Sequence, residues 1–262
     1  MGGAPGRIHP TALVDPQARL AGDVQIGPFC VIGPKVEIGA GTAIGSHVVI
    51  DGRVRLGRNN RISPFASIGG PPQDKKYGGE DSAVEIGDGN TIREYVTINR
   101  GTALDAGVTS IGDDNWIMAY VHFAHDCRIG SHAIFANACQ LAGHVHVGDW
   151  AILGATTLVH QFVHIGAHSF TGMGTFLPQD LPPYVMSAGN PAKPYGLNTE
   201  GLKRRGFSAE ALAALKRAYK TLYRSGMTLE EARRELEAQA AGQPEVRAMV
   251  AFLSTSSRGI LR

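Results

Sequence analysis

The chain has 262 residues, 34 of them glycine, with 7% aromatic and 18% charged residues and a formal net charge of +2. This length is enough for one sizeable core and a small appendage, and the composition argues against disorder and predicts many tight turns. The charge is uneven: residues 1–200 carry 13 Lys and Arg against 17 Asp and Glu, whereas residues 201–262 carry 12 against 6. The basic C-terminal segment predicts either an acidic partner or a solvated helical surface.

The cysteines and the hydropathy indicate a compartment. Cys30, Cys127 and Cys139 are odd in number and form no CxxC pair, which argues against a disulfide framework or a four-cysteine zinc site. The opening MGGAPGRIHP has no signal-peptide pattern, and no apolar run approaches the length of a membrane span. We therefore expect a soluble, cytoplasmic protein with no membrane span. Only the basic tail hints at nucleic acid, so no nucleic-acid partner is predicted.

A period of six organises most of the chain. Aliphatic or phenylalanine residues occupy every sixth position over 8–68, 86–98 and 111–165, often followed by glycine. Neither helical nor simple strand periodicity gives this spacing. It predicts a triangular β-solenoid, in which each hexad forms one short strand and a corner and three hexads complete a coil.

Two interruptions of the period predict loops expelled from the solenoid, at about residues 69–85 and 99–110. The first keeps the phase of the repeat, whereas the second shifts it by seven residues. Loops on a rigid scaffold often carry function, although a tolerated surface insertion is the alternative.

Helices are expected after the last hexad. Ser208 can cap the first, Thr228 begins a capping box for the second, and Pro244 suits the first turn of the third. The predicted domains are a β-solenoid over 1–190 and an α-helical domain over 191–262.

A cluster of histidines is expected at one edge of the solenoid. Positions 18 apart lie above one another, about 4.8 Å apart, so His125, Gly143 and Gln161 form one column. Three more histidines stand near this column: His122, His144 and His160. Because no inward aliphatic position is lost to them, the cluster predicts a functional site and not a set of stray surface histidines.

The chemistry of this cluster has two interpretations. His125 can act as a general base held in one tautomer by Asp126, although Asp126 could instead satisfy only a corner N–H. Gly143 can present its bare N–H to an oxyanion, or it can be one more corner glycine. Three histidines could also hold a catalytic zinc ion. No GxSxG or reactive-cysteine signature appears, so a covalent acyl-enzyme is disfavoured.

At this point the sequence resembles a known family over nearly its whole length. The segments that carry the resemblance are HPTALV, IGPFCVIG, GGPPQDKKY, IREYVTINRGT, NWIMAYVHFAHDC, LAGHVHVGDWAILG, VHQF, QDLPPYV and NTEGLKRRGF. They are similar to the UDP-N-acetylglucosamine acyltransferase of lipid A biosynthesis. The resemblance implies an all-β left-handed parallel β-helix with a small α-helical C-terminal domain, a homotrimer with sites between subunits, and no cofactor or metal. It also implies two substrates, UDP-N-acetylglucosamine and an R-3-hydroxyacyl chain on acyl carrier protein.

The same resemblance implies roles for single residues. His125 matches the family's general base, Asp126 the residue that orients it, and the Gly143 N–H the oxyanion donor. Positions that line the substrate cleft match His122, His144, His160 and Gln161. The family's contacts to the sugar and acyl chain fall at the positions of Asp74 and Lys76 in this sequence. Its contacts to the nucleotide fall at the positions of Asn198, Glu200, Arg204 and Arg205.

Met173 is expected to measure the acyl chain, because some family members have glycine there. A methionine shortens the groove by roughly three to four methylenes, and at about 0.8 kcal/mol each the longer chain loses about 3 kcal/mol. We therefore expect a preference near ten carbons over fourteen. The alternatives to the whole interpretation are an acyl-CoA-dependent hexapeptide acyltransferase, a zinc-dependent carbonic anhydrase on the same solenoid, and a non-catalytic scaffold.

Overall fold

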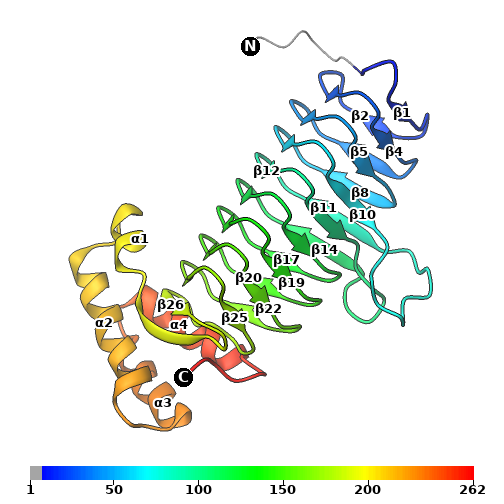
Figure 1. Cartoon of the computed structure of the whole chain (residues 1–262). Helices are drawn as coiled ribbons and strands as arrows, with labels where there is room; N and C mark the ends of the chain where they lie inside the picture. Colours follow the sequence, from blue (N-terminus) through cyan, green and yellow to red (C-terminus); the bar gives the residue numbers. More distant parts are fainter. Residues whose placement is uncertain (1–7) are drawn as a thin grey trace.

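Coils built from short strands, which stack into three mainly parallel sheets, form most of the chain, of which the computed structural model describes residues 8–262. The predicted fold class, a left-handed parallel β-helix with a small helical C-terminal part, is confirmed. The coils stack into a long prism, and the helices gather at the end opposite to the N-terminus (Figure 1). Residues 1–7, the start of the predicted first domain and part of the opening segment, lie outside the described residues.

The three sheets are the three sides of the prism. Sheet A contains β3 (Gln25–Ile26), β6 (Ala43–Ile44), β9 (Arg61–Ile62), β12 (Thr91–Ile92), β15 (Trp116–Ile117), β18 (Ile134–Phe135), β21 (Ile152–Leu153), β24 (Phe170–Thr171), β26 (Val185–Ala188) and β27 (Lys193–Leu197). Sheet B contains β1 (Leu13–Val14), β4 (Val31–Ile32), β7 (Val49–Ile50), β10 (Ser67–Gly70), β13 (Thr97–Asn99), β16 (His122–Phe123), β19 (Gln140–Leu141), β22 (Leu158–Val159) and β25 (Phe176–Leu177). Sheet C contains β2 (Arg19–Leu20), β5 (Val36–Ile38), β8 (Arg53–Leu56), β11 (Ala83–Ile86), β14 (Val108–Ile111), β17 (Arg128–Ile129), β20 (His146–Val147) and β23 (His164–Ile165).

The hexad explains this architecture residue by residue. The second residue of a typical two-residue strand is the periodic one, and it points into a continuous apolar core in which Phe123 and Phe135 pack edge to face. Strands one coil apart pair in register 18 residues apart, as Ile26 does with Ile44. The chain turns between sheets at three corners, which we name the A–B, B–C and C–A corners after the sheets that they join.

Both predicted loops leave the solenoid at the B–C corner, and both are shorter than predicted. The first spans residues 71–82 and the second 100–107, against predictions of about 69–85 and 99–110. The difference arises because β10, β11 and β14 have four residues each and extend beyond the hexad positions that the repeat marks.

The predicted domain boundary at residue 190 needs a correction. It falls between β26 and β27, which pair antiparallel within sheet A, so the sheet continues to Leu197. The helices that follow are α1 (Thr199–Arg204), α2 (Ala209–Arg224), α3 (Leu229–Gln239) and α4 (Pro244–Thr255). The predicted N-cap at Ser208, the capping box at Thr228 and the first-turn proline are confirmed, whereas α1 was not predicted. Among the described residues, no helix has the length and apolarity needed to cross a membrane.

Candidate active site

The histidine cluster and both expelled loops share the B–C corner on successive coils. Residues 71–82 and 100–107 leave this corner, His125 and Asp126 turn it one coil further on, and Gly143 turns it in the next coil. The predicted column is continuous, because the carbonyl of His125 accepts a hydrogen bond from the His144 N–H at 3.0 Å. The corner therefore brings residues far apart in sequence to one edge of the prism.

The side chains of His125 and Asp126 contact each other although they are sequence neighbours. The imidazole Nδ1 lies 2.9 Å from the Asp126 Oδ2. Neighbours on a strand point to opposite faces, but Asp126 has a φ of 60°, in the left-handed region, and this turns its carboxylate back toward the ring. Asp126 is 0% exposed, whereas the His125 side chain retains some exposure to solvent.

Gly143 lies directly against the His125 ring. A Cβ added at Gly143 would stand 2.6 Å from Cε1 and 2.7 Å from Nε2 of His125. The backbone of Gly143 does not have a positive φ, so space for the imidazole, and not backbone conformation, requires glycine here. Within residues 8–262 no hydrogen-bond acceptor faces the Gly143 N–H, which leaves that donor available to a ligand.

His144 completes the edge. Its ring meets that of His125 edge to face with centroids 5.0 Å apart, and its opposite side stacks on Phe162 at 4.4 Å. His122 lies on the outer face of sheet B with its Nδ1 2.7 Å from the Thr97 Oγ1. Burial, reinforced by the neighbouring His125, lowers the pKa of His122, so this ring is neutral at pH 7.

His160 and Gln161 lie at the same corner one coil beyond Gly143. Gln161 is exposed, and the His160 Nδ1 contacts the Gln161 carbonyl at 3.1 Å. The structure thus brings together all six residues that were predicted around the column.

Three residues at this edge could also ligate a metal ion. His125, Asp126 and His144 offer ligand atoms within 4.8 Å of one another, the one such group among the described residues. However, both Asp126 oxygens already accept hydrogen bonds from Thr102, at 2.9 and 2.7 Å. The Oδ2 atom also faces the His125 Nδ1 at 2.9 Å. Because it is thus already shared between two hydrogen-bond donors, the arrangement suits a carboxylate that orients His125.

The two expelled loops contact each other. The Glu80 Oε1 accepts a hydrogen bond from the Ala103 N–H at 3.2 Å, and Arg100 donates to the Tyr77 hydroxyl at 3.2 Å. Asp74 forms a tight turn by accepting from the Lys76 N–H at 3.0 Å, and the Lys76 side chain is exposed. The loop that carries these two predicted contacts is therefore anchored through the second loop to the coil next to the histidines.

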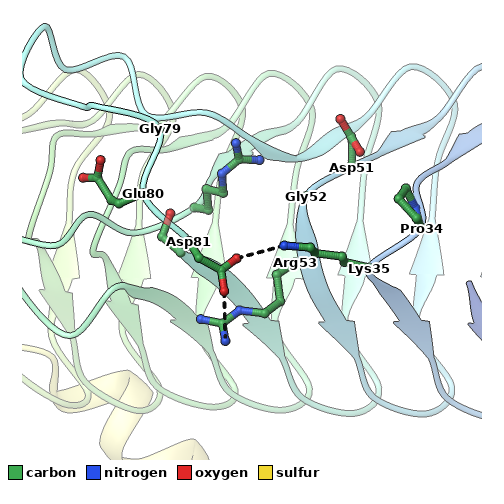
Figure 2. A pocket seen from close by; sticks show the side chains of 10 residues that line it. Pro34, Lys35, Asp51, Gly52, Arg53, Gly79, Glu80 and Asp81 are labelled. Carbon is green, nitrogen blue, oxygen red and sulfur yellow. Dashed lines mark hydrogen bonds and ion pairs between the residues drawn. The ribbon is translucent and has the colours of Figure 1, made fainter. Parts of the chain in front are cut away.

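The base of the first loop encloses a hollow of about 330 Å³ that lies apart from the histidines. In it Asp81 pairs with Lys35 at 3.3 Å and with Arg53 at 3.8 Å, as Figure 2 shows. None of the predicted site residues lines this hollow. The two ion pairs of Asp81 join the base of the loop to the solenoid, which indicates that they hold the loop in place.

The predicted nucleotide residues lie elsewhere, on α1 and at the C–A corner. Arg205 stands 5.2 Å from the centre of the Trp150 ring and 3.3 Å from the His168 Nδ1. Burial, followed by the Arg205 charge, lowers the pKa of His168 to about 4. Arg204 is exposed, so the two adjacent arginines do not face one environment.

Asn198 and Glu200 have internal partners. The Asn198 amide caps α1 by accepting from the Gly201 N–H at 3.2 Å and donates to the His168 carbonyl at 3.0 Å. Glu200 pairs with Lys203 at 2.9 Å on the exposed side of the helix. Asn198 is thus already committed to the structure, which the sequence motif did not indicate.

Met173 lies at the A–B corner, between β24 and β25, and is 78% exposed. Sheet B separates this corner from His125. The predicted site residues of one chain are therefore spread over three corners of the prism.

Sequence analysis missed the residues that contact Asp126 and His144 from outside the column. They come from the second expelled loop and the strand after it: Thr102, Asp105 and Thr109. The one signal that could have found them is the seven-residue shift in the period, because it falls one coil before His125.

Comparisons with known proteins agree with this arrangement. The family model described as "Udp N-acetylglucosamine O-acyltransferase; Domain 2" matches residues 180–261, and that of the bacterial transferase hexapeptide matches residues 109–139. The acyl-[acyl-carrier-protein]–UDP-N-acetylglucosamine O-acyltransferase of Thiobacillus denitrificans is 64% identical, over 97% of this chain and 99% of that protein.

Solved structures give the same result. LpxA from Acinetobacter baumannii superposes with a TM-score of 0.95 and 46% identity, covering 97% of this chain and 99% of that one. The UDP-N-acetylglucosamine acyltransferase of Francisella novicida gives a TM-score of 0.96 and 46% identity, covering 98% and 94%. Because the match extends through the solenoid, both loops and the helices, the chain belongs to the UDP-N-acetylglucosamine O-acyltransferase family of enzymes.

Proposed function

We propose that this protein transfers an R-3-hydroxyacyl chain from acyl carrier protein to the 3-hydroxyl of UDP-N-acetylglucosamine, the first step of lipid A biosynthesis. The observation that carries the proposal is the His125 ring, held at Nδ1 by Asp126 and lying against the bare Gly143. The names of the relatives supply both substrates. Neither the acyl-CoA-dependent alternative nor the carbonic anhydrase gains support from a specific contact.

The geometry suits direct attack assisted by a base. An ionised Asp126 can only accept, so Nδ1 of His125 carries the hydrogen and Nε2 keeps its lone pair. Nε2 takes the proton of the sugar 3-hydroxyl while that oxygen attacks the thioester carbonyl carbon. The new oxyanion accepts a hydrogen bond from the Gly143 N–H, which has no acceptor within residues 8–262.

The intermediate then collapses. The carbon–sulfur bond breaks, the ester bond to the sugar oxygen remains, and His125 returns the proton to the leaving thiolate. The proton thus moves from hydroxyl to sulfur, and the enzyme ends as it began. No covalent acyl-enzyme is needed, and the buried cysteines have pKa values raised by burial, to about 12 for Cys127 and about 11 for Cys139, which makes them poor nucleophiles.

We infer that the site is completed between the subunits of a homotrimer. Within one chain His125, Met173 and Arg205 occupy three different corners, so no single chain places all of them around one substrate. A cyclic assembly of three prisms brings a corner of one chain against a different corner of its neighbour.

An exposed apolar edge supports this assembly. The A–B corner carries a ladder of stacked rings with centroids about 5 Å apart: Phe29, His47, Phe65, Tyr95 and Tyr120. Leu13, Val31 and Val49 are exposed beside it on sheet B. Sheet C in the same coils presents charged residues such as Arg19 and Glu37. A long apolar edge beside a charged face is typical of a surface that another subunit covers.

The remaining proposals concern the donor and the compartment. Met173 is exposed at the A–B corner. In the proposed trimer it is therefore open to an acyl chain bound at the His125 of a neighbouring subunit, which supports a preference near ten carbons. Cys30, Cys127 and Cys139 are unpaired and buried, which supports a reducing compartment such as the cytoplasm.

A mass-spectrometric transfer assay tests the function. UDP-N-acetylglucosamine is incubated with R-3-hydroxyacyl carrier proteins of ten, twelve and fourteen carbons, with a chelator present. We expect one dominant product at ten carbons, and its loss in His125→Ala but not in the control His9→Ala, which changes an exposed histidine far from the site. Absence of product from every donor would refute the proposed reaction, and a fully active His125→Ala enzyme would refute the base.

A further inference from the structure

We propose that Thr102, on the second expelled loop, is a positioning residue for the catalytic pair; the inference rests on the proposed role of His125 as the base. The Thr102 hydroxyl donates a hydrogen bond to the Asp126 Oδ2 at 2.7 Å, and its backbone N–H donates to Oδ1 at 2.9 Å. One residue therefore contacts both oxygens of the carboxylate that orients His125.

The Thr102 hydroxyl binds the same carboxylate oxygen of Asp126 that faces His125. Oδ2 also faces the His125 Nδ1, at 2.9 Å. The Thr102 hydroxyl and the imidazole thus meet at the same atom, while the Thr102 N–H prevents the carboxylate from rotating. Thr102 is 1% exposed and Asp126 is 0% exposed, so water cannot replace either donor without a change in packing.

The path of the loop is adapted to this contact. A Cβ added at Gly101 would lie 2.8 Å from the Asp126 Oδ1 and 2.3 Å from the Val108 N. Gly101 thus lets the loop close onto the carboxylate. A regular coil of 18 residues has no residue at this place, and the seven additional residues supply one. From the other side, the Asp126 N–H donates to the Thr109 Oγ1 at 2.8 Å, which fixes the backbone of the corner.

The same loop also reaches the second histidine. Asp105 lies 3.5 Å from the His144 Nδ1 and 2.7 Å from an Arg128 nitrogen. Partial burial raises the pKa of Asp105, but the contacts with His144 and Arg128 outweigh it and the pKa is lowered. The loop therefore contributes polar partners to both Asp126 and His144, which a merely tolerated surface insertion does not do.

Three variants and a matched control test the inference. Thr102→Val keeps the shape and removes the hydroxyl, Thr102→Ser keeps the hydroxyl, and Thr42→Val removes a hydroxyl that is equally buried but donates to the Gly57 carbonyl in a distant coil. His125→Ala is assayed in parallel. We measure kcat, KM for both substrates and the thermal midpoint.

We expect Thr102→Val to lower kcat by at least about tenfold, a part of the 10²–10⁴-fold that a general base contributes, with KM little changed. Thr102→Ser should recover kcat to within about threefold, and Thr42→Val should lose stability without losing kcat. If kcat of Thr102→Val stays within twofold of wild type while His125→Ala is inactive, the positioning role is wrong. If His125→Ala is active, the proposed base itself fails.

A spectroscopic measurement gives a second test that does not depend on turnover. In ¹⁵N-histidine NMR the wild-type His125 should carry its proton on Nδ1 alone. The resonances of Thr102→Val should show both tautomers, and those of Thr102→Ser only the wild-type one. Identical His125 signals in all three proteins would overturn the proposal. If Thr102→Val is too unstable to measure, Thr102→Ala, which also lacks the hydroxyl, takes its place in the comparison.

Discussion

The Gly143 Cα faces the edge of the His125 imidazole so closely that a methyl group would stand 2.6 Å from its Cε1. This one relationship sets both the place of the ring and the access to the Gly143 N–H. A side chain at position 143 must push the ring away, because real Cβ atoms do not approach carbon that closely. Gly143 is therefore a more direct test of the site's geometry than any substitution of its histidines.

We expect Gly143→Ala to lower kcat by on the order of 10²-fold, the lower end of what a general base contributes, because the added methyl group displaces the His125 ring. The backbone of Gly143 does not have a positive φ, so a decrease in the thermal midpoint should reflect only the displaced ring and its contact with Asp126. Gly22→Ala is the matched control, because a Cβ there meets nothing within 4 Å. Wild-type kcat in Gly143→Ala would show that the ring can move without cost.

A second prediction concerns Asn198, which the family motif assigns to the nucleotide and the structure uses as a helix cap. Asn198→Ala removes the cap of α1 and the bond to the His168 carbonyl, and loss of a cap costs about 1 kcal/mol. We expect a lower thermal midpoint together with a higher KM for the nucleotide sugar. Arg204→Ala, at an exposed position on the same helix, should raise that KM at an unchanged midpoint. If Asn198→Ala left the midpoint unchanged, the cap would not be important to stability.

The repeat predicted the solenoid because one property, an inward aliphatic side chain every sixth residue, determines both strand and coil. The same property also placed His125 and Gly143 in one column. It did not place the loop ends, because β10, β11 and β14 extend by pairing with neighbours that the period does not describe.

The contacts of the site were less predictable than the column. The His125–Asp126 contact depends on the left-handed φ of Asp126, and hexad spacing does not specify a dihedral angle. Thr102 and Asp105 lie in a loop without periodicity, so only the length and position of the insertion marked them. Spacing thus predicts which corner a residue occupies, whereas partners from an insertion follow only from the folded chain.

A third prediction follows from His146 and His168, the two histidines whose pKa is lowered to about 4. Burial lowers the pKa of His168 and of His146 from 6.5 to about 4. Between these values the unfolded chain binds protons that the native state does not, so stability falls as the pH drops from about 6.5 to about 4. The thermal midpoint should decrease through this window, and less steeply in His168→Gln. His9→Gln, at an exposed position, is the control, and an equal slope in all three proteins would contradict the prediction.

The last prediction concerns Met173 and the length of the acyl chain. Its side chain is 78% exposed at the A–B corner, where the proposed trimer would cover it and close the groove. Met173→Gly opens room for roughly four methylenes, and at about 0.8 kcal/mol each the fourteen-carbon donor should gain about a hundredfold in kcat/KM relative to the ten-carbon donor. Competition between the two donors in one reaction, read by mass spectrometry, measures this ratio directly. Met227→Gly, which changes an exposed methionine in the helical region, is the control. An unchanged ratio in Met173→Gly would mean that another residue limits the chain, whereas a reversed preference would place the end of the groove at this corner.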